Sequence, residues 1–570
     1  MAFFLKKSKL KKGVYLQIYE SFYDPVRKAT AHKSHRAVGY VHELIQAGIE
    51  DPIAHFQREV DLLNKQRRDK KVKERARQIS ESSPERFLGY FPLKNINDAL
   101  GVKNDLDWLQ LSTSFRFNIY EMLSALIYAR VVHPCSKHKT FHEVLPRLYE
   151  PADFSFDQLL DGIEFIGSEY EKIIEIYNHR MRQRYPFDTS HAYFDCTNFY
   201  FEIDREDDLR RKGPSKERRL DPIVGMGLLL DANQIPIGMR LFPGNQSEKP
   251  VMREVIDNLK RRNNINGRTI RVADKGLNCA NNIRHALECG DGYIMTKAIK
   301  TLSQTEKEWI LLNRDYVPVT DADGSILYWI KECVDDFPYT ILDNNGREVT
   351  VMLREKRVVT YNESLAKKRR AEIRKQANKA LGHSLSQVKR SEFGDYAKYV
   401  VFESTDKQGQ ATGGKVAVRL NEDAIDLDSL LAGYNLFVTS EVDMPAAEIH
   451  ATYRNLWRIE ESFRVMKSDL EARPVYLQKA DSIVGHFLIC YLAVLLMRLF
   501  QFKILKNNFS SESLIGFFRK FRIVEISERR IMNLSLKTPF ISALAEMTNL
   551  PLTSFNLTHG QVKDMLNHRF

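Results

Sequence analysis

The pattern of apolar positions predicts three antiparallel strands near the middle of the chain. Residues 191–202 form an aromatic, β-prone stretch, and residues 223–230 are almost continuously apolar. An Asp-Ala-Asn-Gln turn over residues 231–234 leads into a further apolar stretch over residues 235–242. We therefore expect three antiparallel strands joined by hairpins.

Helices and strands alternate after this sheet. Residues 250–262 predict a helix with Pro250 in its first turn, and residues 269–274 predict a short strand. Residues 280–288 predict a second helix, and residues 292–296 predict a last strand. The resulting order indicates a mixed α+β or α/β domain.

Two acidic residues stand at unusual places in the predicted strands. Asp195 lies in the middle of the first strand, where aspartate is uncommon and needs a reason. Asp274 ends the fourth strand, at the edge where α/β sheets place their chemistry, although it could equally be an ordinary turn residue. Asp231 is a rival for either place, but the tip of a hairpin points away from such a site.

A third acidic residue lies on a predicted helix over residues 453–467. Tyr453, Glu460 and Lys467 are spaced by seven, which returns to one helix face with a drift of about 20° per step. The helix also carries many apolar side chains, namely Leu456, Trp457, Ile459, Phe463, Val465 and Met466. Buried charges of this kind must pair or bind a metal. The alternative is an ordinary amphipathic helix with a Glu460–Arg464 surface pair.

This segment resembles the C-terminal signature of insertion-sequence transposases with an Asp-Asp-Glu active site. The signature is Tyr, two residues, Arg, three residues, Glu, six residues, Lys. Tyr453, Glu460 and Lys467 match it, whereas Leu456 stands in the place of the Arg. Arg464 lies about 40° from Glu460 around an ideal helix, so we expect it to supply the missing positive charge.

The predicted element order resembles the RNase H-like fold of the same family, with Asp195 on strand one and Asp274 ending strand four. The resemblance implies that Asp195, Asp274 and Glu460 are catalytic and bind two Mg²⁺ or Mn²⁺ ions, for which carboxylates are suitable ligands. It implies that Tyr453 and Lys467 hold a DNA phosphate. It also implies binding of terminal inverted repeats, DNA cleavage, strand transfer to target DNA and cut-and-paste movement by a homodimer in a synaptic complex.

The chain between Asp274 and Glu460 is too long for a single connection and must hold structure of its own. Strands are predicted at residues 326–330, 339–342, 348–354, 398–403 and 416–420, with a basic helix over residues 364–387. This pattern resembles the β-rich insertion of the family, which can hold a flipped base against an aromatic ring. Trp329 is the candidate ring; alternatively it fills the core of the insertion.

The formal net charge of +12 suits a polyanionic partner such as DNA. Basic residues cluster in three runs, between residues 65 and 77, between residues 210 and 219, and between residues 367 and 379. Any one run is more often a solvated face. The middle run follows the Asp195 strand, and its Lys216, Arg218 and Arg219 are candidates for phosphate contacts.

The remaining chain gives weaker signals. Residues 14–22 and 36–41 predict strands, and residues 43–77 predict a basic helix. The helical region that follows could recognise DNA ends or serve as a scaffold. Residues 483–497 are the most apolar and predict a buried core helix, too short to span a bilayer, so no membrane is expected. Six cysteines without metal-ligand spacing indicate reduced thiols in a cytoplasmic protein.

We expect six regions along the chain. They are a basic, DNA-binding candidate at 1–104, a helical region at 105–188, the first part of the catalytic core at 189–300, the β-rich insertion at 301–444, the second part of the core at 445–508, and a helical C-terminal region at 509–570.

The resemblance implies a prokaryotic, nucleoid-associated protein of the cytoplasm. Two alternatives have other functions. One is a transposase-derived DNA-binding protein without catalysis, against which three intact acids argue. The other is an RNase H-like nuclease without strand transfer, against which the Tyr453–Lys467 pairing and the insertion argue.

Overall fold

The computed structural model describes residues 2–24, 29–75, 85–151, 153–217, 219–342, 347–381, 397–405, 415–527 and 530–570. The chain divides into two compact units, Met1–Pro84 and Glu85–Phe570. The division falls at Pro84, whereas the expected boundary followed residue 104. Residues 85–104 belong to the second unit because β4 (Glu85–Phe87) pairs with β16 (Arg522–Ser527).

The first unit is a three-stranded antiparallel sheet covered by a helix. It contains β1 (Phe3–Leu10), β2 (Gly13–Asp24), β3 (Ala29–Tyr40), α1 (Val41–Gln46) and α2 (Pro52–Arg75). Helix α2 packs on β1, where Asn64 bonds both the amide N–H and the carbonyl of Phe3, at 2.9 Å each. The strands predicted at 14–22 and 36–41 fall at β2 and at the end of β3.

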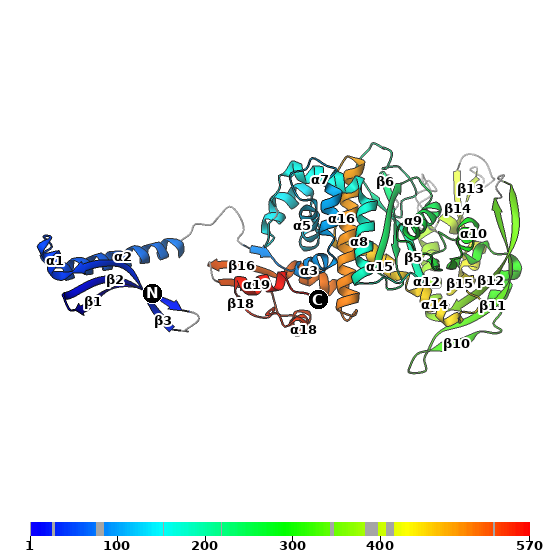
Figure 1. The fold of residues 1–570 in the computed structure, drawn as a ribbon. Coiled ribbons are helices and arrows are strands. Elements are labelled where there is room, and N and C mark those ends of the chain that lie inside the picture. Colours follow the sequence, from blue (N-terminus) through cyan, green and yellow to red (C-terminus); the bar gives the residue numbers. More distant parts are fainter. Residues whose placement is uncertain are drawn as a thin grey trace. The chain divides into compact units, whose positions relative to one another are not determined.

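A nine-stranded sheet forms the centre of the second unit, in the order β10-β11-β12-β15-β9-β8-β5-β6-β7 (Figure 1). Its RNase H-like part contains β5 (His191–Tyr200), β6 (Ile223–Leu230), β7 (Pro236–Pro243), β8 (Ile270–Ala273) and β9 (Gly292–Lys297). β5, β6 and β7 pair antiparallel, whereas β5, β8 and β9 pair parallel. With helices α9 (Glu248–Arg262) and α10 (Ala280–Glu288) in the predicted places, the RNase H-like fold is confirmed.

Most of the expected insertion extends this same sheet. Strands β10 (Val317–Thr320), β11 (Ile326–Leu342) and β12 (Glu348–Tyr361) join the core through β15 (Tyr434–Thr439), which pairs antiparallel with β9. The strands predicted separately at 326–330 and 339–342 are parts of β11. Strands β13 (Val400–Thr405) and β14 (Lys415–Leu420) form a separate hairpin, and the basic helix is α12 (Glu363–Leu381).

A buried polar network joins the added strands to the core. Glu355 in β12 is fully buried and accepts hydrogen bonds from Tyr293 in β9, at 2.9 Å, and from Tyr339 in β11, at 2.6 Å. Arg357 donates to its second oxygen at 3.0 Å. Burial and then the Glu355 charge raise the pKa of both tyrosines, so they remain donors. These partners offset the cost of burying a carboxylate.

The long helix α16 (Ala480–Arg498) is the core of the helical region (Figure 1). Helix α16 packs against four helices of this region: α3 (Phe91–Leu100), α5 (Ile119–Val132), α7 (Phe156–Ser168) and α8 (Tyr170–Arg184). Gly167 and Gly485 permit this close packing, because a Cβ on Gly167 would lie 1.7 Å from the Asp481 carbonyl oxygen and one on Gly485 would lie 2.1 Å from that of Ile163.

The apolar segment Ala480–Ile504 is the one helix among the described residues that is long and apolar enough to cross a membrane. Its most apolar window is 94% buried inside the protein. The prediction of a buried core helix is therefore confirmed for residues 483–497.

The C-terminal region, expected to be helical, also contains strands. Helices α17 (Ser511–Lys520), α18 (Pro539–Thr548) and α19 (His559–Leu566) flank β16, β17 (Arg530–Asn533) and β18 (Asn556–Leu557). These strands and β4 form a sheet in the order β18-β17-β16-β4. The alternating sequence Arg-Ile-Val-Glu-Ile-Ser of β16 is the signal that predicts a strand there.

Candidate active site

The pleat of β5 directs Asp195 toward the helical layer that covers one face of the sheet. Successive strand side chains point to opposite faces. Tyr193 bonds the Asn455 side chain, and the Phe199 ring centroid lies 4.6 Å from that of Phe487 in α16. Asp195 is two residues from Tyr193 and four from Phe199, so it faces the same layer.

Parallel pairing brings Asp274 next to Asp195. Phe194 of β5 is the partner of Ala273 of β8, so the two aspartates follow in register on adjacent strands. Adjacent strands lie about 4.8 Å apart. Asp274 Oδ1 accepts the backbone N–H groups of Gly276, at 2.8 Å, and Leu277, at 3.3 Å, which fixes the turn after β8.

Glu460 lies on α15 (Trp457–Arg464), which packs on β5 and β6. Its side chain is exposed, whereas Leu456 is buried. The prediction of one straight helix over residues 453–467 is wrong. α14 (Ala446–Arg454) ends before α15 begins, because the Leu456 and Ile459 amides bond carbonyls three residues back.

A wider turn follows α15. The residues Val465–Asp469 form a π-helical turn, η5, in which the Leu470 N–H bonds the Val465 carbonyl five residues back. The seven-residue spacing therefore does not place Tyr453, Glu460 and Lys467 in one straight line. Their convergence depends on how α14 and α15 pack against the sheet.

Tyr453 is a residue whose pKa is affected by the charges of all three acids. Its hydroxyl lies 3.1 Å from Thr296 Oγ1 of β9, and its ring centroid lies 5.0 Å from that of Phe437 of β15. Burial is the main cause that raises the pKa of Tyr453 to about 12; the Thr296 bond opposes this rise, and the negative charges of Asp274, Asp195 and Glu460 contribute to it. The charges of all three carboxylates therefore act on one phenol group.

The surroundings of Asp195 disfavour its negative charge. Burial is the main cause that raises the pKa of Asp195 to about 7, and the charges of Asp274 and Glu248 contribute less to this rise. Lys216 and the Cys196 N–H, which bonds Asp195 Oδ1 at 2.7 Å, oppose it. Removal from water is therefore the main cost of the Asp195 charge, and a divalent cation bound there would offset it.

The acids are spread rather than gathered at one point. Ligand atoms of Asp195, Asp274 and Glu460 do not all lie within 4.8 Å of one another. Two ions in such a site lie about 4 Å apart, so oxygen atoms that bind different ions can be separated by two ligand bonds plus this distance. A separation above 4.8 Å between some of the ligand atoms is therefore compatible with a two-ion site.

One other set of metal-ligand side chains lies closer together. Asp257, His285 and Cys289 bring their ligand atoms within 4.8 Å among the described residues. However, His285 Nε2 is 3.1 Å from Asp257, and its Nδ1 is 2.9 Å from an Arg271 nitrogen. Both ring nitrogens are engaged, so this cluster is held together without a metal.

One lysine and one arginine pair with Glu217, and a second lysine lies near Asp195. Lys467 lies 3.5 Å from Glu217 Oε1, and Arg473 pairs with the same oxygen. Burial lowers the pKa of Lys467. Lys216 donates to the Cys196 carbonyl and lies 3.9 Å from Glu248 Oε1. The loop after β5 and the segment after α15 thus bring their cations to one edge of the sheet.

The other predicted DNA contacts lie farther from the acids or are already paired. Arg464 is 53% exposed and lies 3.2 Å from Asp469 Oδ2. Arg219 stacks on Tyr200, 3.7 Å from the ring centroid. Arg218 lies outside the described residues.

Trp329 is half-buried, and its strand neighbours show which face it occupies. Lys331, two residues on, reaches α11 (Gln304–Leu311), where its Nζ donates to the Trp309 carbonyl. Tyr328 faces the opposite side, with its ring centroid 4.4 Å from that of His450 in α14. The face that carries Tyr453 therefore presents Tyr328, and the structure does not bring Trp329 to the acids.

Glu248 is the residue near the acids that sequence reasoning missed. It is the first residue of α9, and its charge raises the pKa of Asp195 and of Cys196. An acid in the first turn of a helix usually serves the helix dipole, so the sequence alone gives no reason to single it out. Asp231, by contrast, accepts the Asp188 and Ile235 amides and fixes its hairpin.

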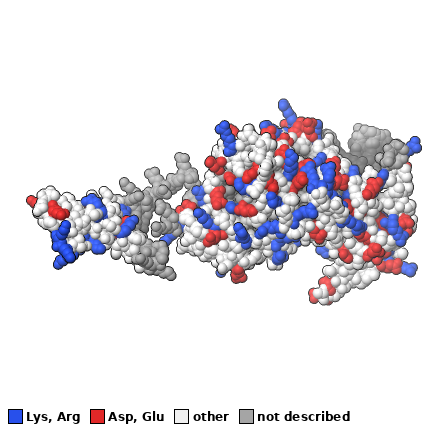
Figure 2. All heavy atoms as spheres, viewed as in Figure 1, with Lys and Arg blue, Asp and Glu red and all other residues white. Residues whose placement is uncertain are grey.

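Basic and acidic side chains are interspersed over the face of the second unit that Figure 2 shows. Within the run on α12, Lys367 pairs with Glu363 at 2.8 Å and Arg369 with Glu372 at 3.1 Å. These pairs agree with a solvated helix face. Most side chains of the run at 65–77 lie outside the described residues.

Comparison with known families gives one match. The model of the family described as transposase DDE domain matches residues 208–496, about half of the chain. The match contains Asp274 and Glu460, and it begins after Asp195. No curated protein matches the chain significantly.

The raised pKa of Asp195 predicts a pH-dependent cost of folding. Between its ordinary value of 3.8 and about 7, the folded protein binds a proton that the unfolded chain has lost. Stability therefore falls as pH rises through this range, and the loss is complete above pH 7. Asp195→Asn removes the cost, so in chelator it should raise the melting temperature by about 1–3 °C near pH 8.5 and by less near pH 5.

Differential scanning fluorimetry measures this difference, with Asp323→Asn in an exposed turn as the control. An equal shift at both pH values would show that the carboxylate of Asp195 is not the cause.

Proposed function

Because the chain belongs to the transposase DDE domain family, we propose that it cleaves DNA at the terminal inverted repeats of an insertion sequence and joins the cut ends to target DNA. The observation that supports this proposal is that Asp195 and Asp274 follow in register on adjacent strands, while the charge of Glu460 acts together with theirs on the Tyr453 phenol. A phosphate held at that phenol would lie near these carboxylates.

Asp195, Asp274 and Glu460 are the residues that we propose to hold Mg²⁺ or Mn²⁺, with two ions per site. Their carboxylate chemistry and the cost of burying the Asp195 charge support this assignment. When bound, the ions would activate water or a 3′-hydroxyl and stabilise the leaving oxygen.

The protein's own groups would bind and orient the DNA strand. The raised pKa of Tyr453 keeps its phenol protonated, so it can donate a hydrogen bond to a phosphate oxygen. Lys467 shares Glu217 with Arg473, so a phosphate could replace part of that pairing. We propose that Tyr453 and Lys467 grip the phosphate next to the scissile bond, and that Lys216 and Arg219 contact the strand beyond it.

The proposed cycle is cut-and-paste transposition by a homodimer that holds both element ends, in a prokaryotic cytoplasm. The arrangement of the acids argues against a protein that only binds DNA, because a binding function does not require the cost of half-burying Asp195 among like charges. A nuclease without strand transfer would use the same acids, so only the reaction products distinguish it.

Asp195→Asn should abolish cleavage of a labelled element end in Mg²⁺ and leave its binding within about twofold, because the change removes a proposed metal ligand and no basic contact. Cleavage is measured on denaturing gels and binding by fluorescence anisotropy. Joined products in the wild-type reaction would support strand transfer, and hydrolysis alone would favour the nuclease. Equal loss of binding and cleavage would show that Asp195 has a structural role instead.

Arg464→Ala should weaken binding of an element-end duplex, because we propose that this exposed side chain replaces the arginine absent at Leu456. Loss of one phosphate contact should lower the slope of log affinity against log salt by about 0.9. Arg261→Ala on α9, also exposed, is the matched control. Equal slopes for the two variants would reject Arg464 as the replacement.

Glu248→Gln should lower the affinity for Mn²⁺ by about 10-fold, as expected when a charged neighbour of metal ligands is neutralised. Electron paramagnetic resonance counts free Mn²⁺ directly and needs no DNA. Glu254→Gln, on the same helix and 3.0 Å from Arg240, is the control. Unchanged Mn²⁺ affinity would limit Glu248 to its pairing with Lys216.

A further inference from the structure

A cavity of about 780 Å³ lies beside the segment that follows the Glu460 helix. The C-terminal end of α5, helix α6 (Lys137–Lys139), residues 471–478 and the start of α16 line it. Four of its lining residues are cationic side chains, at Arg130, Lys137, Lys139 and Arg473. The lining contains a single carboxylate, that of Glu471.

Two of these cations have no anionic partner among the described residues. Arg130 is 5% exposed, and its only hydrogen bond reaches the Leu470 carbonyl at 3.5 Å. The ammonium group of Lys137 has neither an ion pair nor a hydrogen bond within the part of the chain that the structure describes. Glu471 does not compensate them, because its charge acts on His133 rather than on Lys137.

His486 adds an unused nitrogen to the same cavity. It is 4% exposed, and its Nε2 lies 3.0 Å from the Ala472 carbonyl oxygen, so the proton of the neutral ring belongs on Nε2. Its Nδ1 is buried and has no hydrogen-bond partner. Buried polar atoms are rarely left in this state, so an absent partner is expected.

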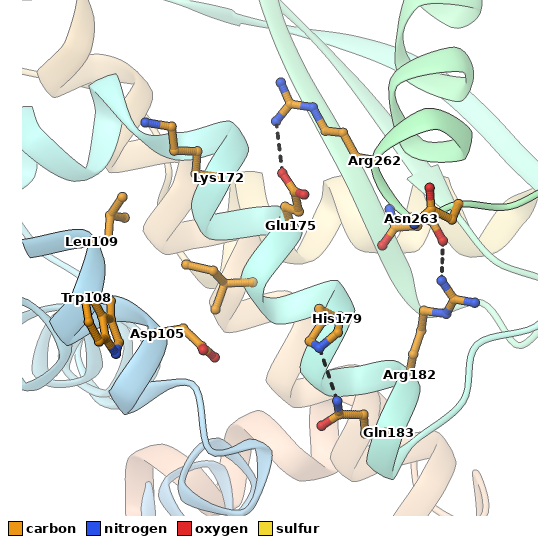
Figure 3. Close-up of a pocket in the computed structure, with 12 residues that line it drawn as sticks. Asp105, Trp108, Leu109, Lys172, Glu175, His179, Arg182, Gln183, Arg262 and Asn263 are labelled. Carbon is orange, nitrogen blue, oxygen red and sulfur yellow. Dashed lines mark hydrogen bonds and ion pairs between the residues drawn. The ribbon is translucent and has the colours of Figure 1, made fainter.

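A second large cavity allows the pairing of lining cations to be compared. It measures about 920 Å³ and lies between α4 (Lys103–Gln110), α8 and the end of α9 (Figure 3). Two of its three cations have anionic partners: Lys172 pairs with Glu169, and Arg262 pairs with Glu171 and Glu175. The third, Arg182, donates to the Asn263 carbonyl. Among the described residues, the cavity beside residues 471–478 thus differs from this one in having two cations without an anionic partner and only one carboxylate in its lining.

The first cavity is continuous with the basic edge near the acids. Arg473 lines it and also pairs with Glu217, which Lys467 approaches at 3.5 Å. Gln478, another lining residue, accepts from Arg210 in the loop after β5. A strand leaving Lys467 would thus reach the cavity through side chains already in contact.

We propose that this cavity binds a phosphate group, which Arg130 and Lys137 contact directly while the backbone of a single DNA strand runs out from the catalytic edge. The assignment of the phosphate to a DNA strand rests on the proposed function. The binding chemistry does not, because buried Arg130 and half-buried Lys137 together would suit the phosphate of any phosphate-bearing ligand.

Binding should be coupled to proton uptake. Burial and then the charge of Arg130 lower the pKa of Lys137 to about 7, and the thiols of Cys490 and Cys135 oppose this weakly. Burial and then Lys137 and Arg130 lower the pKa of His486. An anion favours the protonated forms, so affinity should rise as pH falls from about 8.5 to about 6.5. The charged or titratable groups that face Lys137 here are Arg130, Cys135, His486 and Cys490.

The test uses the full-length protein in chelator, so that no metal-dependent cleavage contributes. Binding of a fluorescein-labelled single-stranded oligonucleotide is followed by anisotropy over a salt series. Lys137→Gln should weaken binding about 10-fold, lower the salt slope by about 0.7 and reduce the pH dependence. Lys137→Arg should restore affinity without the Lys137 contribution to the pH dependence. Lys563→Gln in α19 is exposed and removes the same charge elsewhere.

Each outcome decides the proposal. Equal affinities and slopes for wild type, Lys137→Gln and Lys563→Gln would overturn the strand assignment. Inorganic phosphate forms the second arm: if it raises the melting temperature of wild type but not of Lys137→Gln, while strand binding is unchanged, the site takes free phosphate. If neither ligand discriminates the variants, there is no phosphate site, even where Mg²⁺-dependent cleavage of element ends proceeds normally.

Discussion

Burial of the Asp195 carboxylate, with other carboxylates beside it, is the constraint on which the candidate site depends. The register of β5 and β8 places Asp195 and Asp274 next to each other, and Glu248 adds a third charge from α9. Such an arrangement costs free energy in the absence of cations. The fold tolerates it because the nine-stranded sheet fixes the backbone from both sides, and Lys216 offsets part of the charge.

Lys216 illustrates how the protein limits that cost. Its ammonium group bonds the Cys196 carbonyl and lies 3.9 Å from Glu248, so it is anchored to the same strand that carries Asp195. A positive charge fixed to the scaffold lowers the repulsion without occupying every carboxylate oxygen. The acids therefore remain able to bind cations. A mobile lysine that paired with them directly would have to be displaced before a cation could bind.

The sequence predicted the sheet well because its signals are local. Residues 191–242 alternate or run apolar as strands do, and the short turn at 231–234 specifies a hairpin. Asp195 and Asp274 could be singled out because an acid within or at the end of such a strand is unusual. Glu248 could not, since a first-turn glutamate is ordinary, and its meaning arises only from packing.

The segment that carries Glu460 shows a second limit of prediction from sequence, because its helix geometry changes along its length. Seven-residue spacing assumes uniform geometry, whereas the amide of Leu456 bonds three residues back and that of Leu470 five residues back. Sequence periodicity does not predict such local changes, which follow from packing of α14 and α15 on the sheet.

The junction between core and insertion depends on the partners of one carboxylate. Glu355 needs Tyr293 from β9, Tyr339 from β11 and Arg357 from its own strand, and no spacing rule links these residues in sequence. Because β12 reaches β9 only through β15, loss of this network would loosen the strands beside Thr296. Thr296 in turn positions the Tyr453 hydroxyl. The buried glutamate of the insertion therefore helps to set the position of the phenol whose pKa the charges of the three acids raise.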